Sequence, residues 1–334
     1  MNTNSAELLT LSPSPHVKHK KTTNVIMLDV LIALSPAFIW SIIAFGYMAA
    51  MLTVISVALC VFYEFAYQKL TKKPVTVSDL SAAVTGMLIA FNLPVTCAPW
   101  VLIFGCFFAI VVVKQLFGGI GKNIVNPAIA ARIFMFVSWP SQLSDYPNFR
   151  FYVSDAVSQA TPLTALKSGS APVGSQNPFA CFLGLTGGSL GEISAALLIV
   201  GGIYLLVRRV ITWHIPVSFV ATVALFALIF PQAQGISHVN SMLWHVCSGG
   251  LMLGAIFMAT DYTTSPVTKV GRLIYGFGCG LLTIAIRYLG AYPEGVSFAI
   301  MIMNLLVWYI DRATMPRVFG QKKAKNHGEG GASK

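Results

Sequence analysis

Charged residues are scarce in this chain of 334 residues, which has only 11 Asp or Glu and 22 Lys or Arg. Hydrophobic residues make up 56% of the sequence, and its mean hydropathy is +0.73. A soluble domain could not bury so much apolar surface, and apolar runs of about 20 residues, long enough to cross a bilayer, recur along the chain. The composition excludes a soluble enzyme, a coiled coil and a disordered chain. It predicts an all-α integral membrane protein.

The excess of basic residues, a formal net charge of +11, does not predict nucleic-acid binding. Such binding needs basic residues gathered on one face, whereas here they lie at the ends of apolar runs, as charges that orient a membrane protein do. With a cytoplasmic N-terminus, the outer side holds only Arg150, Lys167 and Arg287. The asymmetry predicts that both termini are cytoplasmic, and therefore that the number of spans is even.

Several other features are missing as well. The six cysteines are scattered and form no C-x-x-C pair, so no metal or iron–sulfur site is expected. The polar first two dozen residues do not read as a removable signal peptide. No glycine-rich loop stands between a strand and a helix, so any NADH must bind to a partner.

About ten apolar segments are predicted to cross the membrane. They are 25–45, 48–68, 77–93, 99–117, 126–139, 193–207, 215–230, 242–260, 273–289 and 296–310. The sequence then divides into a cytoplasmic N-terminal segment (1–24), a first five-helix repeat (25–139), a polar outer loop (140–191), a second five-helix repeat (192–311) and a cytoplasmic tail (312–334). The outer loop is the first place to look for chemistry, because long loops of this kind are usually functional or disordered.

The two halves resemble each other. Phe104-Gly105-Cys106, followed by Lys114, has the same spacing as Phe277-Gly278-Cys279, followed by Arg287. A repeat of five spans crosses the membrane an odd number of times, so the two copies must be inverted, with sites expected where broken helices meet near the midplane.

Both halves contain such a break. Gly118–Asn123 precedes Asn126-Pro127, and Gly290 precedes Tyr292–Gly295. Each break leaves backbone N–H groups at a helix start that suit an anionic or polar ligand. A reentrant turn buried in protein explains them equally well.

Three acidic residues in or near the predicted spans are candidates for an ion pathway, because a carboxylate is costly in the membrane. They are Asp29, Asp261 and Glu294. Asp29 lies one turn into the first span, where snorkelling to the inner surface is an alternative. Asp261 precedes Thr263-Thr264-Ser265-Pro266 and is the stronger candidate.

The outer loop contains Asp155, Ser158, Ala160 and Thr161 in a pattern that resembles the D-x-x-[ST]-G-A-T motif, on which a flavin transferase attaches FMN. In that chemistry the threonine hydroxyl, here that of Thr161, becomes the oxygen of a phosphoester. The sequence departs from the motif at Gln159, where glycine is most frequent. Read without the family, the segment is a polar loop closed by a Thr-Pro turn.

The resemblance extends over nearly the whole chain. It includes Met27–Leu31, Gly121–Ala128, Gly187–Glu192, Phe257–Asp261, Tyr292–Val296 and Met303-Asn304. Together these segments resemble the D subunits of Rnf ion-translocating oxidoreductases and the related B subunits of sodium-pumping NADH:quinone reductases. The shorter N-terminal extension favours the Rnf group.

The resemblance implies a membrane subunit of a redox-driven ion translocase, not catalytic alone, that carries electrons on covalent FMN. It implies a second, noncovalent flavin, riboflavin or FMN, near Asn123 and Asn126. The implied partners are Rnf subunits A, B, C, E and the FMN-bearing G, a flavin transferase and the lipid bilayer of the bacterial inner membrane.

Other functions stay open. A urea-channel-like transporter shares the inverted five-span repeat but has no reason to keep the attachment spacing around Thr161. A structural scaffold for redox partners would not need that hydroxyl. The carboxylates serve sodium ions and protons equally, so the sequence does not identify the ion.

Overall fold

The computed structural model describes residues 22–144, 146, 161–167, 178–192, 194–232, 237–290 and 292–316. Within these ranges the chain is helical, with no strand. The first half contains α1 (Thr23–Phe45), α2 (Tyr47–Leu70), η1 (Val77–Asp79), α3 (Ser81–Phe91), α4 (Pro99–Phe107), the π-helix η2 (Phe108–Gln115), α5 (Pro127–Ser138) and α6 (Pro140–Leu143). After α7 (Pro162–Lys167) and α8 (Pro178–Leu183) come α9 (Ala195–Val207), α10 (His214–Ile229), α11 (His238–Cys247), α12 (Leu251–Leu253), the π-helix η3 (Gly254–Met258), α13 (Lys269–Leu289) and α14 (Val296–Thr314).

Each of the ten predicted apolar segments is helical, but not all are full spans. Among the described residues, α1, α2, α13 and α14 are long and apolar enough to cross a membrane. The bent pair of α11 with α12–η3 makes a fifth if it is counted as one span. The other apolar helices are shorter, and α3 has only 11 residues. The prediction of about ten full spans is therefore confirmed only for these four or five.

The eighth predicted segment, 242–260, contains a break that its sequence does not predict. Gly249 and Gly250 both have positive φ, +69° and +66°, and the two parts of the segment meet at 58°. Two successive left-handed residues stop a helix, and only glycine adopts that conformation without strain. The segment is a broken helix rather than a continuous one.

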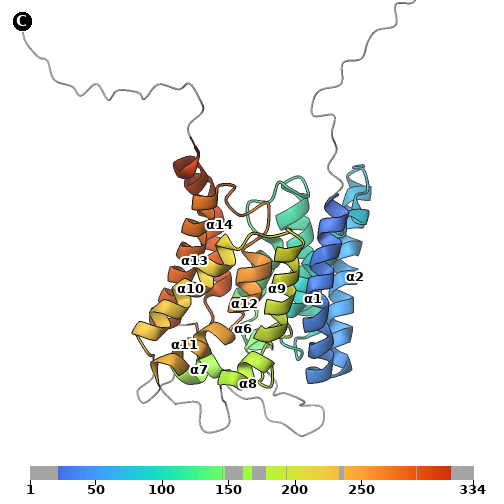
Figure 1. The fold of residues 1–334 in the computed structure, drawn as a ribbon. Helices are drawn as coiled ribbons and strands as arrows, with labels where there is room; N and C mark the ends of the chain where they lie inside the picture. Colours follow the sequence, from blue (N-terminus) through green and yellow to red (C-terminus); the bar gives the residue numbers. More distant parts are fainter. Residues whose placement is uncertain are drawn as a thin grey trace, which may run out of the picture.

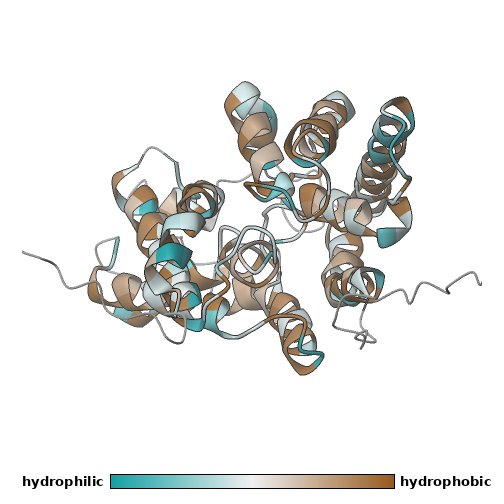
Figure 2. Ribbon diagram, turned by 90° about the horizontal axis from the view of Figure 1, so that it is seen from above, coloured by the Kyte–Doolittle hydropathy of each residue, from teal (hydrophilic) through white to brown (hydrophobic). Residues whose placement is uncertain are grey.

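The bundle has two distinct ends (Figure 1). Helix α1 begins and α14 ends at one of them, here called the terminal end, while α7 and α8 lie at the other, the distal end. Helices α1 and α9 pack against each other and run in opposite directions, since Asp29 near the start of α1 contacts Arg208 just after α9. Seen along the bundle, the helices are largely hydrophobic (Figure 2).

The two halves use the same pattern of contacts. In the first half α2 packs on α3 and α4, and α4 packs on α5; in the second, α10 packs on α11 and α13, and α13 packs on α14. Helix α1 packs against α9, and α5 packs against α14, so these two pairs join the halves.

Small residues bring α10 and α13 together. Gly276 and Gly280, one helical turn apart on α13, face α10, and a Cβ at Gly276 would lie 2.8 Å from the carbonyl oxygen of Ile215. Small residues at this spacing let helix backbones approach closely in membranes, where packing rather than the hydrophobic effect drives association.

Replacing Gly276 with leucine should therefore destabilise the bundle by about 1–3 kcal/mol, the usual cost of overpacking. Thermal unfolding of the purified protein in detergent measures the loss. Gly278→Ala is the matched control, because its Cβ would meet only the flexible end of Met303. Equal unfolding midpoints for the two variants would contradict this account of the interface.

Candidate functional site

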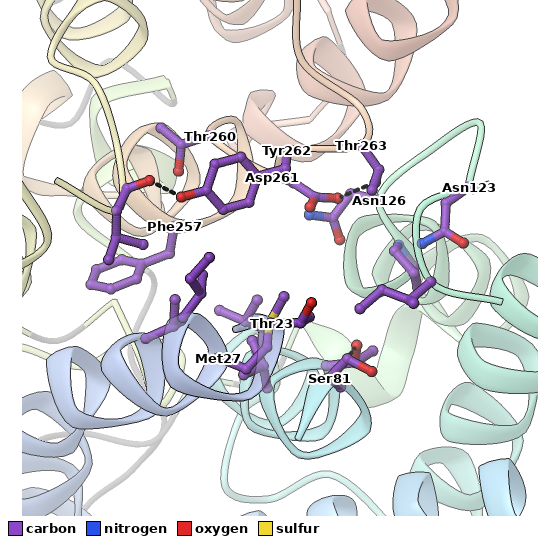
Figure 3. A pocket seen from close by; sticks show the side chains of 18 of the residues that line it. Thr23, Met27, Ser81, Asn123, Asn126, Phe257, Thr260, Asp261, Tyr262 and Thr263 are labelled. Carbon is purple, nitrogen blue, oxygen red and sulfur yellow. Dashed lines mark hydrogen bonds between the residues drawn. The ribbon is translucent and has the colours of Figure 1, made fainter. Parts of the chain in front are cut away.

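A cavity of about 360 Å³ lies near the terminal end, between the two halves (Figure 3). Its wall includes Thr23 and Met27 from the first turns of α1, Ser81 from α3, and Phe257 and Thr260 from the second half. Most of the lining is apolar, with a few polar groups that converge on it. A largely apolar cavity with a few fixed polar groups is the usual form of a small-molecule site.

Asn123 and Asn126 both line this cavity, but they have different roles. The side chain of Asn126 is the N-cap of α5, because its Oδ1 accepts hydrogen bonds from the N–H groups of Ala128 and Ile129. Its Nδ2 donates to the carbonyl oxygen of Met258 at the end of η3, 3.2 Å away. Asn126 therefore joins two helix ends from different halves of the chain.

Asn123 lies in the glycine-rich connection before α5. Its Oδ1 is buried and has no hydrogen-bond partner among the described residues. A buried acceptor without a partner costs about 1–3 kcal/mol, so such an atom at a cavity wall points to a donor on a ligand.

Asp261 lies in the connection between η3 and α13 and also lines the cavity. Its carboxylate accepts hydrogen bonds from Thr263 at 3.0 Å and Thr264 at 3.3 Å, and it has no basic partner among the described residues. Burial raises the pKa of the Asp261 carboxyl, and the threonine hydrogen bonds act in the opposite direction. Asp261 is thus a second acceptor of hydrogen bonds in the cavity wall.

Lys114 is the basic member of the cavity wall, and it is almost fully buried. Its ammonium lies 2.8 Å from Glu64 on α2 and 2.6 Å from the hydroxyl of Ser81. Gln115 also donates to Glu64, at 2.7 Å. Two successive residues can reach the same carboxylate because both lie in the π-helix η2, and π-helical turns often occur at functional sites.

Thr161 lies at the distal end, just before α7. Its hydroxyl is 2.7 Å from that of Thr164, in an exposed position at the start of the short helix. Lys167, at the other end of α7, donates to the carbonyl oxygen of Tyr292 at 3.0 Å, and partial burial lowers its pKa. Thr161 is thus held against the second half while its hydroxyl stays accessible.

A small polar pocket of about 20 Å³ beside Thr161 is lined by Glu192 and Glu294. Both carboxylates contact the Nη2 of one buried guanidinium, that of Arg132 on α5, with Glu192 at 3.2 Å. Glu192 lies in the connection before α9, where burial raises its pKa to about 7 and the Glu294 carboxylate acts in the same direction.

A chain of polar contacts connects the cavity with this pocket. Asn126 bonds to Met258, whose sulfur is 3.7 Å from Nδ2 of Asn92, and Oδ1 of Asn92 accepts from Arg132 at 2.8 Å. The terminal-end and distal-end sites are therefore separated by four side chains, here called the polar chain: Asn126, Met258, Asn92 and Arg132.

The predicted ion-pathway residues do not lie together. Asp29 bonds to Tyr204 at 3.0 Å and pairs with Arg208 at 3.2 Å, Glu294 pairs with Arg132, and Asp261 lines the cavity. Asp29 is buried, whereas the side chain of Arg208 is 46% exposed, so the pair itself explains this carboxylate in the membrane. Of the attachment motif, Thr161 is described, whereas Asp155, Ser158 and Ala160 lie outside the described residues.

Neither Arg132 nor the pairing of Lys114 with Glu64 was predicted from the sequence. Arg132 carries a usable signal, since it is a basic residue inside an apolar segment, and such residues are rare without a partner. Its partners are distant in sequence, however, and only the folded chain brings them together.

Comparison with known proteins gives a consistent result. The model of the NQR2, RnfD, RnfE family matches residues 10–320. The chain is 46% identical over 320 residues to a protein of Acetobacterium woodii named as the D subunit of a Na(+)-translocating ferredoxin:NAD(+) oxidoreductase complex, covering 95% of this chain and 97% of that protein. It is 38% identical over 323 residues, with coverage of 95% and 97%, to a protein of Clostridium ljungdahlii named as the D subunit of a proton-translocating ferredoxin:NAD(+) oxidoreductase complex. The D subunit of an ion-translocating oxidoreductase complex from Stutzerimonas stutzeri is 38% identical over 331 residues, with coverage of 90% and 93%.

Proposed function

Because the chain belongs to the NQR2, RnfD, RnfE family, we propose that it is a membrane subunit of an ion-translocating electron-transport complex and carries electrons on two flavins. The relatives are named as subunits of ferredoxin:NAD(+) oxidoreductase complexes, so the redox partners are other subunits. Within such a complex the protein's contribution is to hold and tune the flavins.

The first proposed flavin is FMN, attached through a phosphoester to Thr161. Support comes from the attachment motif and from the position of Thr161 at the start of an accessible short helix that Lys167 fixes to the second half. An outward position lets this flavin exchange electrons with a partner subunit, for which the FMN-bearing G subunit is the proposed candidate.

The second proposed flavin is noncovalent and occupies the terminal-end cavity. The observation that carries this proposal is the unpaired, buried Oδ1 of Asn123 at the cavity wall, with Asp261 as a second acceptor. The ribityl hydroxyls and the imide N–H of a flavin are donors that suit both. Lys114, the basic lining residue, is already paired with Glu64, so riboflavin, which has no phosphate, fits better than FMN.

Flavin content tests both parts of the proposal. The full-length protein, co-expressed with a flavin transferase, is purified and precipitated with acid. We expect about one flavin to stay with the polypeptide as FMN and about one to be released as riboflavin. A protein with neither flavin, purified from cells with an active transferase, would favour a urea-channel-like transporter instead.

The two asparagines should respond differently to substitution. Asn123→Ala should reduce the releasable flavin at least tenfold and leave the unfolding midpoint nearly unchanged, because its side chain supports no helix end. Asn126→Ala removes an N-cap and a contact between the halves, so it should also lower stability, by about 1–2 kcal/mol. Flavin release and thermal unfolding in detergent measure the two effects. Equal loss of stability in both variants would contradict the distinction.

We also propose that the two halves are an inverted repeat with both termini in the cytoplasm of a bacterial inner membrane. The matched positions Gly105 and Gly278 both face a methionine, Met135 and Met303 respectively. The matched Lys114 and Arg287 are both buried, with 2% and 1% of their surface exposed. Random similarity between apolar helices does not require such agreement in three dimensions.

The transported ion is not identified by similarity, because relatives named for sodium and for proton transport match over the same share of the chain. Asp261 and Glu294 lie at opposite ends of the polar chain, which makes them the proposed carboxylates for ion movement between the two ends. Asp29 is left out of this path, since it is held by Arg208 and Tyr204.

A further inference from the structure

We infer that Lys114 is the positioning residue that sets the reduction potential of the flavin in the terminal-end cavity. The inference rests on the proposed noncovalent flavin. A flavin gains negative charge on its ring when it is reduced, and a positive group nearby favours that state. Lys114 is the basic residue among those described in the cavity wall.

The contacts of Lys114 give its charge a fixed direction. Lys114 and Ser81 line the cavity, whereas Glu64 does not, so the ion pair presents its positive end to the ligand. Ser81 is itself fixed, because its hydroxyl donates to Asp79 at 2.6 Å. A lysine on the surface would swing freely, but this ammonium is held from two sides.

Burial makes the effect large. The side chains of Lys114 and Glu64 are 2% and 1% exposed. Charges out of contact with water interact much more strongly than the same charges at a surface, because solvent does not screen them. The ion pair also predicts opposite effects for its two members, since Glu64 weakens the field of Lys114 at the cavity.

The opposite wall leaves the ring free to lie near Lys114. Asp261 and the unpaired Oδ1 of Asn123 are acceptors, which suit the hydroxyl groups of the ribityl chain. These groups are not redox active. The division of the cavity into acceptors on one wall and an ammonium on the other therefore assigns the redox ring to the side of Lys114.

The test is a redox titration of the full-length protein carrying Thr161→Ala, so that the noncovalent flavin is the one observed. We expect Lys114→Met to make reduction at least tenfold less favourable, a shift of about 59 mV per tenfold for one electron. Lys114→Arg should stay within about threefold of the parent. Lys122→Met is the matched control, because Lys122 belongs to the same connection but is exposed and does not line the cavity.

A second variant keeps the test decisive if Lys114→Met loses its flavin. Glu64→Gln keeps the ammonium, and it should make reduction more favourable. An unchanged potential in the variant that retains flavin would overturn the inference while leaving the flavin site in place. Absence of releasable flavin from the unsubstituted protein would instead overturn the proposed function itself.

Discussion

Replacing Thr161 with alanine is expected to abolish covalent flavin completely. The phosphoester would be formed on the threonine hydroxyl, and no other atom of the side chain can replace that oxygen. In-gel fluorescence of the denatured protein, co-expressed with a flavin transferase, measures the result: a fluorescent band for the unsubstituted chain and a dark one for the variant. The flavin released by acid should stay constant, because Thr161 does not line the terminal-end cavity.

Thr164→Ala is the matched control for this experiment. Thr164 lies in the adjoining short helix, is exposed, and its hydroxyl lies 2.7 Å from that of Thr161. Loss of this neighbour should leave a fluorescent band. A dark band for the unsubstituted chain beside an active transferase would show that Gln159 spoils the motif, and a fluorescent Thr161→Ala band would show that flavin is attached elsewhere.

Replacing Arg132 with leucine should be the most destabilising of the substitutions considered. It would leave Glu192 and Glu294 buried close together, with 4% and 18% of their side chains exposed, and would remove their shared guanidinium. Removing one partner of a buried ion pair costs about 3–5 kcal/mol, because an uncompensated charge remains. Unfolding in detergent at neutral pH measures the loss.

Two comparisons show whether burial of charge is the cause. Arg208→Leu breaks the pair with Asp29, whose arginine is 46% exposed, and should cost only about 0.2–1 kcal/mol. Adding Glu192→Gln to Arg132→Leu should restore part of the stability by removing one of the two stranded charges. No recovery in the double variant would mean that Arg132 acts mainly through its hydrogen bond to Asn92.

The positions of the helices could be predicted from the sequence because hydropathy and helix breakers are local properties. Asn126-Pro127 is an example: an N-cap residue followed by proline predicts a helix start, and α5 begins there. The break at Gly249–Gly250 was missed because the surrounding residues are apolar enough to suggest one continuous span. Composition alone does not report backbone conformation.

The candidate sites were only partly predictable, for a different reason. Asn123 and Asn126 were linked to a flavin by resemblance, and both line one cavity with Asp261. Nothing in the sequence indicates that Asn126 holds two helix ends while Asn123 has a free acceptor. That difference depends on Met258, a residue 132 positions away in the chain.

The polar chain also has a consequence for how the protein experiences a membrane voltage. The cavity lies near one end of the bundle and the Thr161 pocket at the other, so the low-dielectric barrier between them is only four side chains thick: Asn126, Met258, Asn92 and Arg132. An electric field concentrates where the insulating layer is thinnest. A charge that moves between the two sites would therefore cross much of the membrane potential in one short step, at about 2.3 kcal/mol per 100 mV for the full potential. Voltage would then act on electron transfer inside the protein itself, as a load opposing or assisting each electron.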